Sequence, residues 1–258
     1  MEIRMVMQRL AVLFVLLFSI GVAVNADTYL KYRRSTDPYT AGGQSYPAAT
    51  AEATAWIGSR QAAYDDGEGN RSIMTFATRT LTVINTAEKT YTVLNLDSLS
   101  SMIDQVIDDN TEDAQSAAAM KAMMQGIMGT VMKGAMTVTN TGEQKTIGSW
   151  RCTKYDVNVN LTVAGTHSEM WITDQIKIDA AAFNMVKNGV MAMLPGFSDI
   201  AGEFEKIKGV PVKTVSTAQS MGTNIVTTET LLESAEKKAP EGIYSIPAGF
   251  SRQSLTGE

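Results

Sequence analysis

The chain has 258 residues, of which 44% are hydrophobic and 19% charged, and its formal net charge at pH 7 is −5. This length provides for one large domain or two small ones, and the composition excludes collagen-like, coiled-coil and wholly disordered proteins. A nucleic-acid partner is not expected, because a surface that neutralises phosphates needs an excess of Lys and Arg. One Cys and one His provide no material for a zinc cluster, a disulfide framework or a Cys–His catalytic pair.

The first residues have the pattern of a secretory signal peptide. Arg4 and Arg9 precede an apolar run from Leu10 to Val24, and a small-residue cleavage pattern ends at Ala26. The run of 15 residues is shorter than the ~20 that cross a bilayer as a helix, so an uncleaved membrane anchor is the weaker alternative. We expect cleavage of residues 1–26 and a periplasmic or secreted domain over residues 27–258.

Alternation of apolar with polar residues predicts strands in both halves of the chain. In the first half they form an antiparallel meander with the strands Thr28–Arg34, Ala51–Ile57, Ile73–Phe76, Thr80–Ile84 and Thr90–Leu94. In the second half the expected strands are Thr146–Val163 and Ser168–Thr173, joined by a turn at Ala164–Thr166, and two strands between Val210 and Leu232.

Helical spacing interrupts the strands in two places. A first helix is predicted from Leu99 to Ile107, a second from Thr111 to about Met136, and further helical segments over residues 179–194 and 198–206. A sheet that buries one face needs a cover, and helices between strands can provide it. We therefore expect an α+β fold in one domain, with a large curved, mostly antiparallel sheet covered by helical insertions near 98–136 and 179–206.

Six methionines stand within the second predicted helix: Met120, Met123, Met124, Met128, Met132 and Met136. Five of these step by four residues, so they trace a stripe along a helix, and Gly126, Gly129 and Gly134 are interleaved with them. A Met stripe is often plain core, since Met fills irregular gaps. It can also be a pliable lid that faces an apolar ligand, or a soft-metal site for copper.

Catalytic motifs are missing. The acidic turn around Asp65 and Asp66 does not follow the EF-hand pattern and is interpreted as a solvated loop. His167 belongs to a hairpin and is expected to be exposed, and Cys152 is expected to be a small buried side chain. We therefore assign no metal, no cofactor and no catalytic residue, and expect a protein that is not an enzyme.

Several segments carry a family resemblance: Ile147–Val157, Glu169–Thr173, Lys208–Lys213, Tyr244–Phe250 and, more loosely, Lys89–Val93. In these segments the chain resembles the secreted bacterial family called Domain of Unknown Function 4412. That family is similar in design to periplasmic lipoprotein-carrier proteins, in which a curved, incomplete antiparallel barrel with helical lids encloses an apolar cavity. The resemblance implies a half-barrel fold and a compartment, and it supplies no catalytic residue.

These observations lead to three hypotheses. The first is a soluble periplasmic protein that binds a lipid or acyl chain between its sheet and the Met-rich lid. The second is a structural or sensory module whose core is filled by its own side chains and whose partner is another envelope protein. The third is a copper binder, which requires the thioether sulfurs to converge on one point.

Overall fold

The computed structural model describes residues 26–98, 101, 105, 107–108, 111, 113–122, 136–161, 164–178, 202–203, 205–220 and 222–253. Strands account for 61% of these residues, and one continuous helix covers residues 114–122. The predicted α+β fold with helical insertions is therefore wrong, and the protein is mostly β. Two parts of the predicted helices, residues 123–135 and 179–201, lie outside the described residues.

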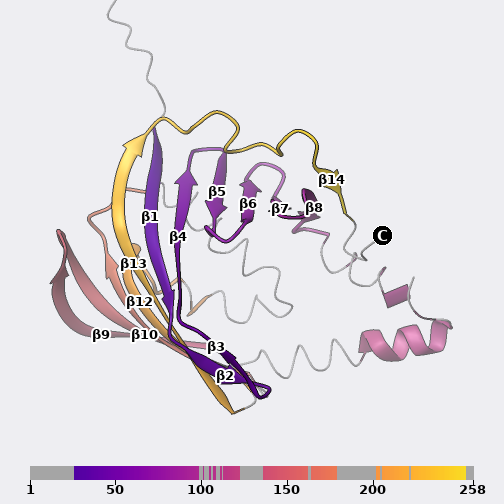
Figure 1. The fold of residues 1–258 in the computed structure, drawn as a ribbon, viewed down its shortest axis with the longest axis horizontal. Helices are drawn as coiled ribbons and strands as arrows, with labels where there is room; N and C mark the ends of the chain where they lie inside the picture. Colours follow the sequence, from indigo (N-terminus) through magenta and orange to yellow (C-terminus); the bar gives the residue numbers. More distant parts are fainter. Residues whose placement is uncertain are drawn as a thin grey trace, which may run out of the picture.

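Most strands belong to a single twelve-stranded sheet that does not close into a barrel (Figure 1). Its order is β14-β8-β7-β6-β5-β4-β1-β13-β12-β11-β10-β9, and all neighbours are antiparallel except β14 and β8. The strands of the first half are β1 (Asp27–Thr36), β4 (Ala49–Ile57), β5 (Gln61–Asp65), β6 (Asn70–Thr75), β7 (Thr80–Asn85) and β8 (Thr90–Asn95). The others are β9 (Met136–Ile147), β10 (Trp150–Leu161), β11 (Ala164–Thr173), β12 (Val210–Ser220), β13 (Thr223–Lys237) and β14 (Ser251–Arg252).

The predicted meander is confirmed by strands β4, β6, β7 and β8, and the sheet adds β5, which was not predicted, between β4 and β6. A small separate hairpin of β2 (Tyr39–Ala41) and β3 (Gln44–Tyr46) lies between β1 and β4 in the sequence. Gly67 shows why the acidic turn between β5 and β6 needs glycine. Its φ is +72°, and a Cβ there would lie 2.1 Å from the backbone oxygen of Glu52.

The second half of the sheet differs from the prediction in its hairpins. The predicted strand Thr146–Val163 is divided by a turn at Gly148, so that β9 pairs with β10. The predicted turn at Ala164–Thr166 is already part of β11, where Thr166 pairs with Val159. The two strands predicted on either side of Gly222 are confirmed as β12 and β13.

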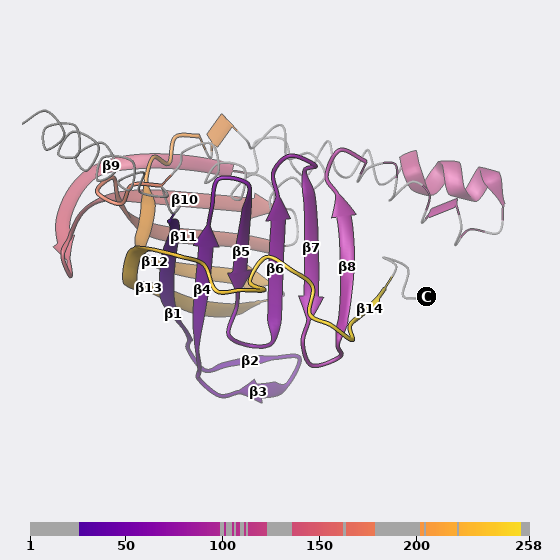
Figure 2. The same cartoon turned by 90° about the horizontal axis from the view of Figure 1, so that it is seen from above.

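The two halves of the sheet meet at β1, which pairs with β4 on one side and β13 on the other. In Figure 2 the long strands β9 to β13 run across the direction of the short strands β4 to β8, and in Figure 1 they curve strongly. Curvature is aided by irregularities in register, for example between Lys31 and Tyr32 of β1 and between Trp171 and Ile172 of β11.

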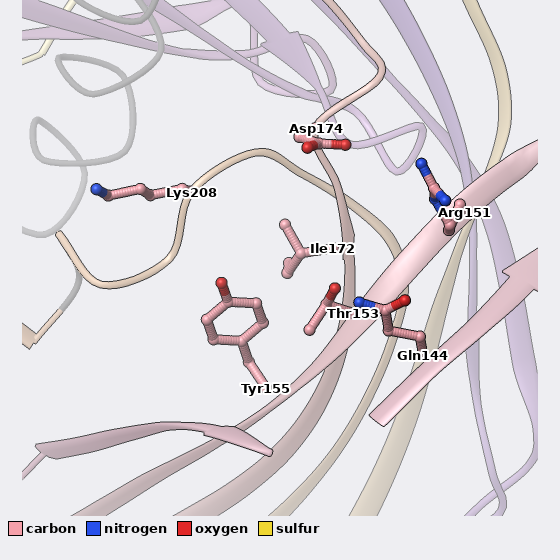
Figure 3. A pocket seen from close by; sticks show the side chains of 7 residues that line it. All are labelled: Gln144, Arg151, Thr153, Tyr155, Ile172, Asp174 and Lys208. Carbon is pink, nitrogen blue, oxygen red and sulfur yellow. The ribbon is translucent and has the colours of Figure 1, made fainter. Parts of the chain in front are cut away.

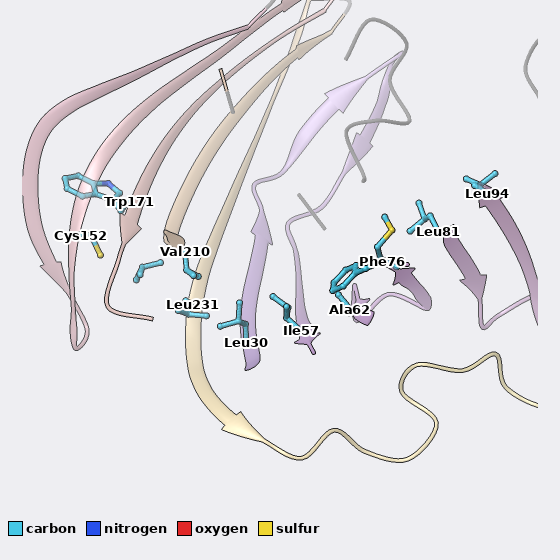
Figure 4. Close-up of a cluster of buried hydrophobic side chains, with 12 residues drawn as sticks. Leu30, Ile57, Ala62, Phe76, Leu81, Leu94, Cys152, Trp171, Val210 and Leu231 are labelled. Carbon is cyan, nitrogen blue, oxygen red and sulfur yellow. The ribbon is translucent and has the colours of Figure 1, made fainter. Parts of the chain in front are cut away.

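Three groups of buried apolar side chains hold the sheet. Cluster one runs from Leu94 on β8 to Cys152 on β10 (Figure 4). Its members are Leu30, Ile57, Ala62, Met74, Phe76, Leu81, Leu94, Cys152, Trp171, Val210, Val212 and Leu231. Cluster two consists of Met136, Val138, Tyr155, Val157, Ile172 and Ile207. Cluster three consists of Ala63, Ile73 and Ile84, and the C-terminal residues Ile243, Tyr244 and Phe250 cover it. The burial predicted for Cys152 is confirmed.

Candidate functional site

A cavity of about 450 Å³ lies where β9, β10 and β11 meet the segment before β12. Five of its residues are on strands: Gln144, Arg151, Thr153, Tyr155 and Ile172. Asp174 and Lys208 complete the wall. Because Arg151, Thr153 and Tyr155 alternate along β10, they point to one face of the sheet, and Gln144 is the direct cross-strand partner of Thr153.

The wall of the cavity is held by hydrogen bonds at its edge. The backbone N–H of Arg151 donates to the Gln175 side-chain oxygen at 2.7 Å, and the backbone N–H of Gln175 donates to the Thr173 hydroxyl at 3.3 Å. These bonds hold the segment after β11 against the start of β10. They therefore fix Asp174 beside Arg151 in the cavity wall.

Two cationic side chains, Arg151 and Lys208, line the cavity. Figure 3 shows Lys208 and Arg151 on opposite sides of Ile172, with Asp174 between them. Among the described residues neither cation has an ion pair, whereas Lys206 pairs with Glu203 and Lys154 pairs with both Asp156 and Glu169. The cavity wall therefore carries a small excess of positive charge.

Tyr155 joins the polar cavity to an apolar surface. Its hydroxyl accepts a hydrogen bond from the Asn140 amide at 3.2 Å, so that the phenolic proton is left to donate to another group. Tyr155 and Ile172 are members of both the cavity wall and cluster two. Val157 and Met170 continue this apolar surface on β10 and β11. The cavity is thus polar at one side and leads to buried apolar side chains at the other.

A second cavity of about 340 Å³ lies at the start of β1, between Asp27, Gly58, Lys177 and Glu236. The Tyr244 hydroxyl donates a hydrogen bond of 2.6 Å to Asp27, which ties the C-terminal segment to this strand. Burial, and then the hydrogen bond to the Asp27 carboxylate, raises the pKa of Tyr244 well above its ordinary range. The neutral phenol is therefore the stable form here, and the contact is structural.

Another polar group, around Arg34, is satisfied by its own neighbours. The Arg34 guanidinium donates to Glu229 at 3.0 Å, to the Tyr64 hydroxyl at 2.6 Å and to Glu68 at 3.3 Å. Burial raises the pKa of Tyr64 despite the nearby guanidinium. With its donors engaged in this way, Arg34 has little capacity for a ligand.

Comparison with known proteins places the chain in a family. A family described as "Domain of unknown function (DUF4412)" matches residues 116–250, which include every residue of the 450 Å³ cavity wall. The chain belongs to the DUF4412 family. No curated protein matches the sequence.

The DUF4412 chain also has a distant likeness to a solved structure titled "Structure of PNGF-II in C2 space group". The TM-score is 0.38 and the identity 10%, over 88% of this chain and 31% of that chain. The DUF4412 chain thus spans about a third of the length of that protein, and a likeness of this size carries no argument about function.

The predicted methionine site of this DUF4412 chain is described at its two ends only. Met120 lies on the helix 114–122 and is 43% exposed, whereas Met136 is the first residue of β9 and belongs to cluster two. Met123, Met124, Met128 and Met132 lie outside the described residues. In Figure 1 and Figure 2 the helix 114–122 lies apart from the sheet, on the side of β8 and β14, and it does not cover the long strands.

The other sequence-based interpretations fall on described residues. His167 is exposed as predicted, and its Nδ1 donates to Asn158 at 2.8 Å. The Asp66 carboxylate accepts backbone hydrogen bonds from Glu68 and Asn70, so it serves the turn itself. Partial burial opposes ionisation of Asp66, but these bonds outweigh it and lower its pKa.

Two further observations concern metals and membranes. In the described ranges no group of three or more His, Cys, Asp or Glu side chains could hold a metal ion. No helix among the residues that can be described is long and apolar enough to span a membrane.

The cavity residues were missed by the sequence-based search for site residues. Arg151, Thr153 and Tyr155 come from one of the segments that carry the family resemblance, and Lys208 begins another. The one indication of these site residues in the sequence is therefore that they lie in segments that carry the family resemblance. The charged residues within them are separated by more than fifty positions, and only the fold brings them to one cavity.

Proposed function

We propose that this protein is a non-enzymatic binding protein that holds an apolar ligand, such as a lipid or acyl chain, against the face of its curved sheet that carries cluster two. The observation that carries the proposal is the double role of Tyr155 and Ile172, which line the cavity and also belong to cluster two. Val159 and Met170, which pack against cluster two, are half-buried and extend the apolar surface that a ligand would contact. Affinity would come from the burial of apolar surface, at about 25 cal/mol per Å² less the ordering costs.

The predicted location supports this role. The sequence preceding Asp27 has the pattern of a secretory signal peptide, and a protein outside the cytoplasm would meet lipids in transit through the envelope. Met136, one of the six predicted site residues, lies in cluster two, where a flexible thioether can adapt to different apolar shapes. The ligand-facing role of the other methionines stays a prediction.

A direct test uses an apolar probe and one variant in the surface that the ligand is proposed to contact. The neutral dye N-phenyl-1-naphthylamine should bind the protein with increased fluorescence, and oleyl alcohol should displace it. Met170→Asp places a charge on the half-buried surface next to cluster two and should weaken dye binding about tenfold or more. Absence of dye binding, with no displacement by oleyl alcohol, overturns the proposal.

A matched control keeps this test specific. Val226 is also half-buried, but it pairs with Thr217, whereas Met170 pairs with Thr214, so the two side chains point to opposite faces of the sheet. Val226→Asp should leave dye binding unchanged when near-ultraviolet circular dichroism shows that both variants are folded. Equal losses in both variants would show that the effect is general destabilisation and would contradict the assigned path.

A second candidate function is an envelope interaction module with a self-filled core. The burial of the clusters favours it, because Val210 and Val212 of cluster one are at most 1% exposed and Ile172 of cluster two is only 3% exposed. Native mass spectrometry of protein purified from its own host separates the two candidates. A stoichiometric lipid adduct supports the binding protein, and an apo mass without uptake of oleyl alcohol supports the interaction module.

A further inference from the structure

Strands β2 and β3 form an uncharged hairpin, residues 39–46, which we call the arm. Residues 38–51 contain no charged side chain, whereas charged residues make up 19% of the whole chain. Figure 2 shows the arm beyond the ends of β1 and β4, where it stands out from the twelve-stranded sheet. All three residues of β3 are exposed. Because depletion of charge is a mark of surfaces that bind a partner, the arm is suited to a neutral one.

Two tyrosines form an aromatic platform on one face of the arm. Tyr39 and Tyr46 are direct cross-strand partners, and their rings stack with centroids 4.7 Å apart and planes 12° apart. Tyr39 is half-buried and Tyr46 is 37% exposed, so the platform keeps an accessible aromatic surface. The stacking holds the two rings in one orientation before any partner binds.

Hydrogen-bonding groups lie at the edge of the platform. Gln44 is two residues from Tyr46 along β3 and therefore on the same face, and its Oε1 accepts a hydrogen bond from the Tyr46 hydroxyl at 3.4 Å. The Gln44 amide keeps two N–H donors, and the Tyr46 hydroxyl oxygen keeps the capacity to accept. A sugar ring has an apolar C–H face and hydroxyl groups at its rim. An aromatic ring with a donor and an acceptor at its edge is complementary to both.

The backbone of the arm is fixed in this shape. Gly42 and Gly43 form its tip with φ of +58° and +81°, and a two-residue hairpin turn of type I′ requires positive φ at both positions. The Thr223 hydroxyl donates a hydrogen bond of 3.0 Å to the backbone oxygen of Thr40, which ties β2 to the start of β13. A site that is ordered in advance loses less entropy when a ligand binds.

The size of the platform favours a sugar over a protein. A specific protein interface buries about 800 Å² on each partner, around an apolar centre. The exposed large hydrophobic side chains of the described residues are Tyr46, Met120, Leu232 and Ile246. Tyr46 is the member of this group that belongs to the arm. One aromatic ring is too small for the centre of a protein interface, but it matches the face of a single sugar ring.

We propose that the platform is a binding site for a neutral oligosaccharide, in which a sugar ring packs on Tyr46 while its hydroxyl groups bond to the Gln44 amide and the Tyr46 oxygen. The arm lies outside residues 116–250, which match the family, and it contributes no residue to the 450 Å³ cavity. The sugar site is therefore separate from the proposed apolar ligand and does not depend on it.

The test measures sugar binding by saturation-transfer difference NMR with protein produced from the full chain. Three neutral probes are titrated, cellohexaose, chitohexaose and maltohexaose, and at least one should receive saturation at its ring C–H groups. Tyr46→Ala removes the ring and should weaken binding about tenfold or more. Gln44→Ala and Tyr46→Phe keep the ring and each lose one polar group, so each should weaken binding about fivefold. Ile246→Ala is the control, because Ile246 is 38% exposed and lies outside the arm, and it should have no effect.

Each outcome supports or overturns the sugar site. If none of the three probes binds, or if Tyr46→Ala binds them as strongly as wild type, the site is wrong. Equal losses in Ile246→Ala and Tyr46→Ala would place the sugar on another surface and would also overturn it. A photo-cross-linker at position 46 that captures a protein in the native host, without binding of any probe, would assign the arm to a protein interface instead. These results are independent of dye binding, which tests the proposed function.

Discussion

Glu203 Oε2 accepts a hydrogen bond of 2.8 Å from the backbone N–H of Val138, the third residue of β9. β9 is the last strand of the sheet, so no strand in the described part of the chain pairs with its outward N–H groups. The Glu203 carboxylate takes the place of a strand carbonyl at this position. Capping of this kind protects an edge strand from pairing with another chain.

This contact predicts a pH dependence of stability. A hydrogen bond from Lys206, then the bond from Val138, lowers the pKa of Glu203 below its ordinary value of 4.5. Its contribution is therefore complete above about pH 4.5 and is lost as the pH falls through the lowered pKa of the folded state. In thermal unfolding, Glu203→Gln should lower the melting temperature at pH 7, and the difference from wild type should shrink as the pH falls below 4.5.

A control carboxylate separates this contact from general acid effects. Glu241 is exposed and lies in the C-terminal segment, away from β9. Glu241→Gln should follow the wild-type curve at every pH. Parallel curves for wild type and Glu203→Gln between pH 3 and 7 would disprove the role assigned to Glu203.

Tyr244→Phe should loosen the C-terminal segment from β1. The Tyr244 hydroxyl donates at 2.6 Å to the Asp27 carboxylate, and a hydrogen bond to a charged group in a partly exposed site contributes about 1 kcal/mol. We expect urea unfolding to show a loss of about this size, and hydrogen exchange to become faster in residues 243–250. Tyr46→Phe is the control, since its hydroxyl makes an exposed contact of 3.4 Å, and it should be neutral.

Arg34→Met should destabilise the junction between the two halves of the sheet. Arg34 on β1 donates to Glu229 on β13 and to the Tyr64 hydroxyl on β5, and its removal leaves both without their donor. The cost should be about 1–3 kcal/mol in urea unfolding, at the low end because these side chains are only partly buried. Arg60→Met, at an exposed turn between β4 and β5, should change stability by less than about 0.5 kcal/mol.

The parts of the fold that could be predicted from the sequence are those with local signals. Strands β4 to β8 alternate apolar with polar residues, and turn residues such as Gly67 and Lys89 separate them. β9 was missed because it is an edge strand with mostly exposed polar residues, from Thr139 to Thr146, and so lacks the alternation that marks a buried face. Its β-branched residues Thr137 and Val138 were the remaining clue.

The candidate site could not be predicted because its determinants are not local. Arg151 and Lys208 come to the wall of one cavity only through the pairing of β10 with β11 and of β11 with β12. The turn predicted at Ala164–Thr166 shows that sequence-based prediction can also fail between residues that are close in the chain. Gly165 pairs with Asn160 inside a hairpin, and no property of the residue itself distinguishes a strand position from a turn position.

Gly209 links the backbone of the sheet to the cavity, and its substitution should reduce stability. Its φ is +117°, and a Cβ would lie 2.3 Å from the backbone oxygen of Thr173, so Gly209→Ala must shift the chain at this point. Lys208 and Asp174 are the neighbours of these two residues and line the cavity. We expect a loss of about 1–3 kcal/mol in urea unfolding beyond that of Gly222→Ala, whose φ is +80° but whose Cβ would meet nothing within 4 Å.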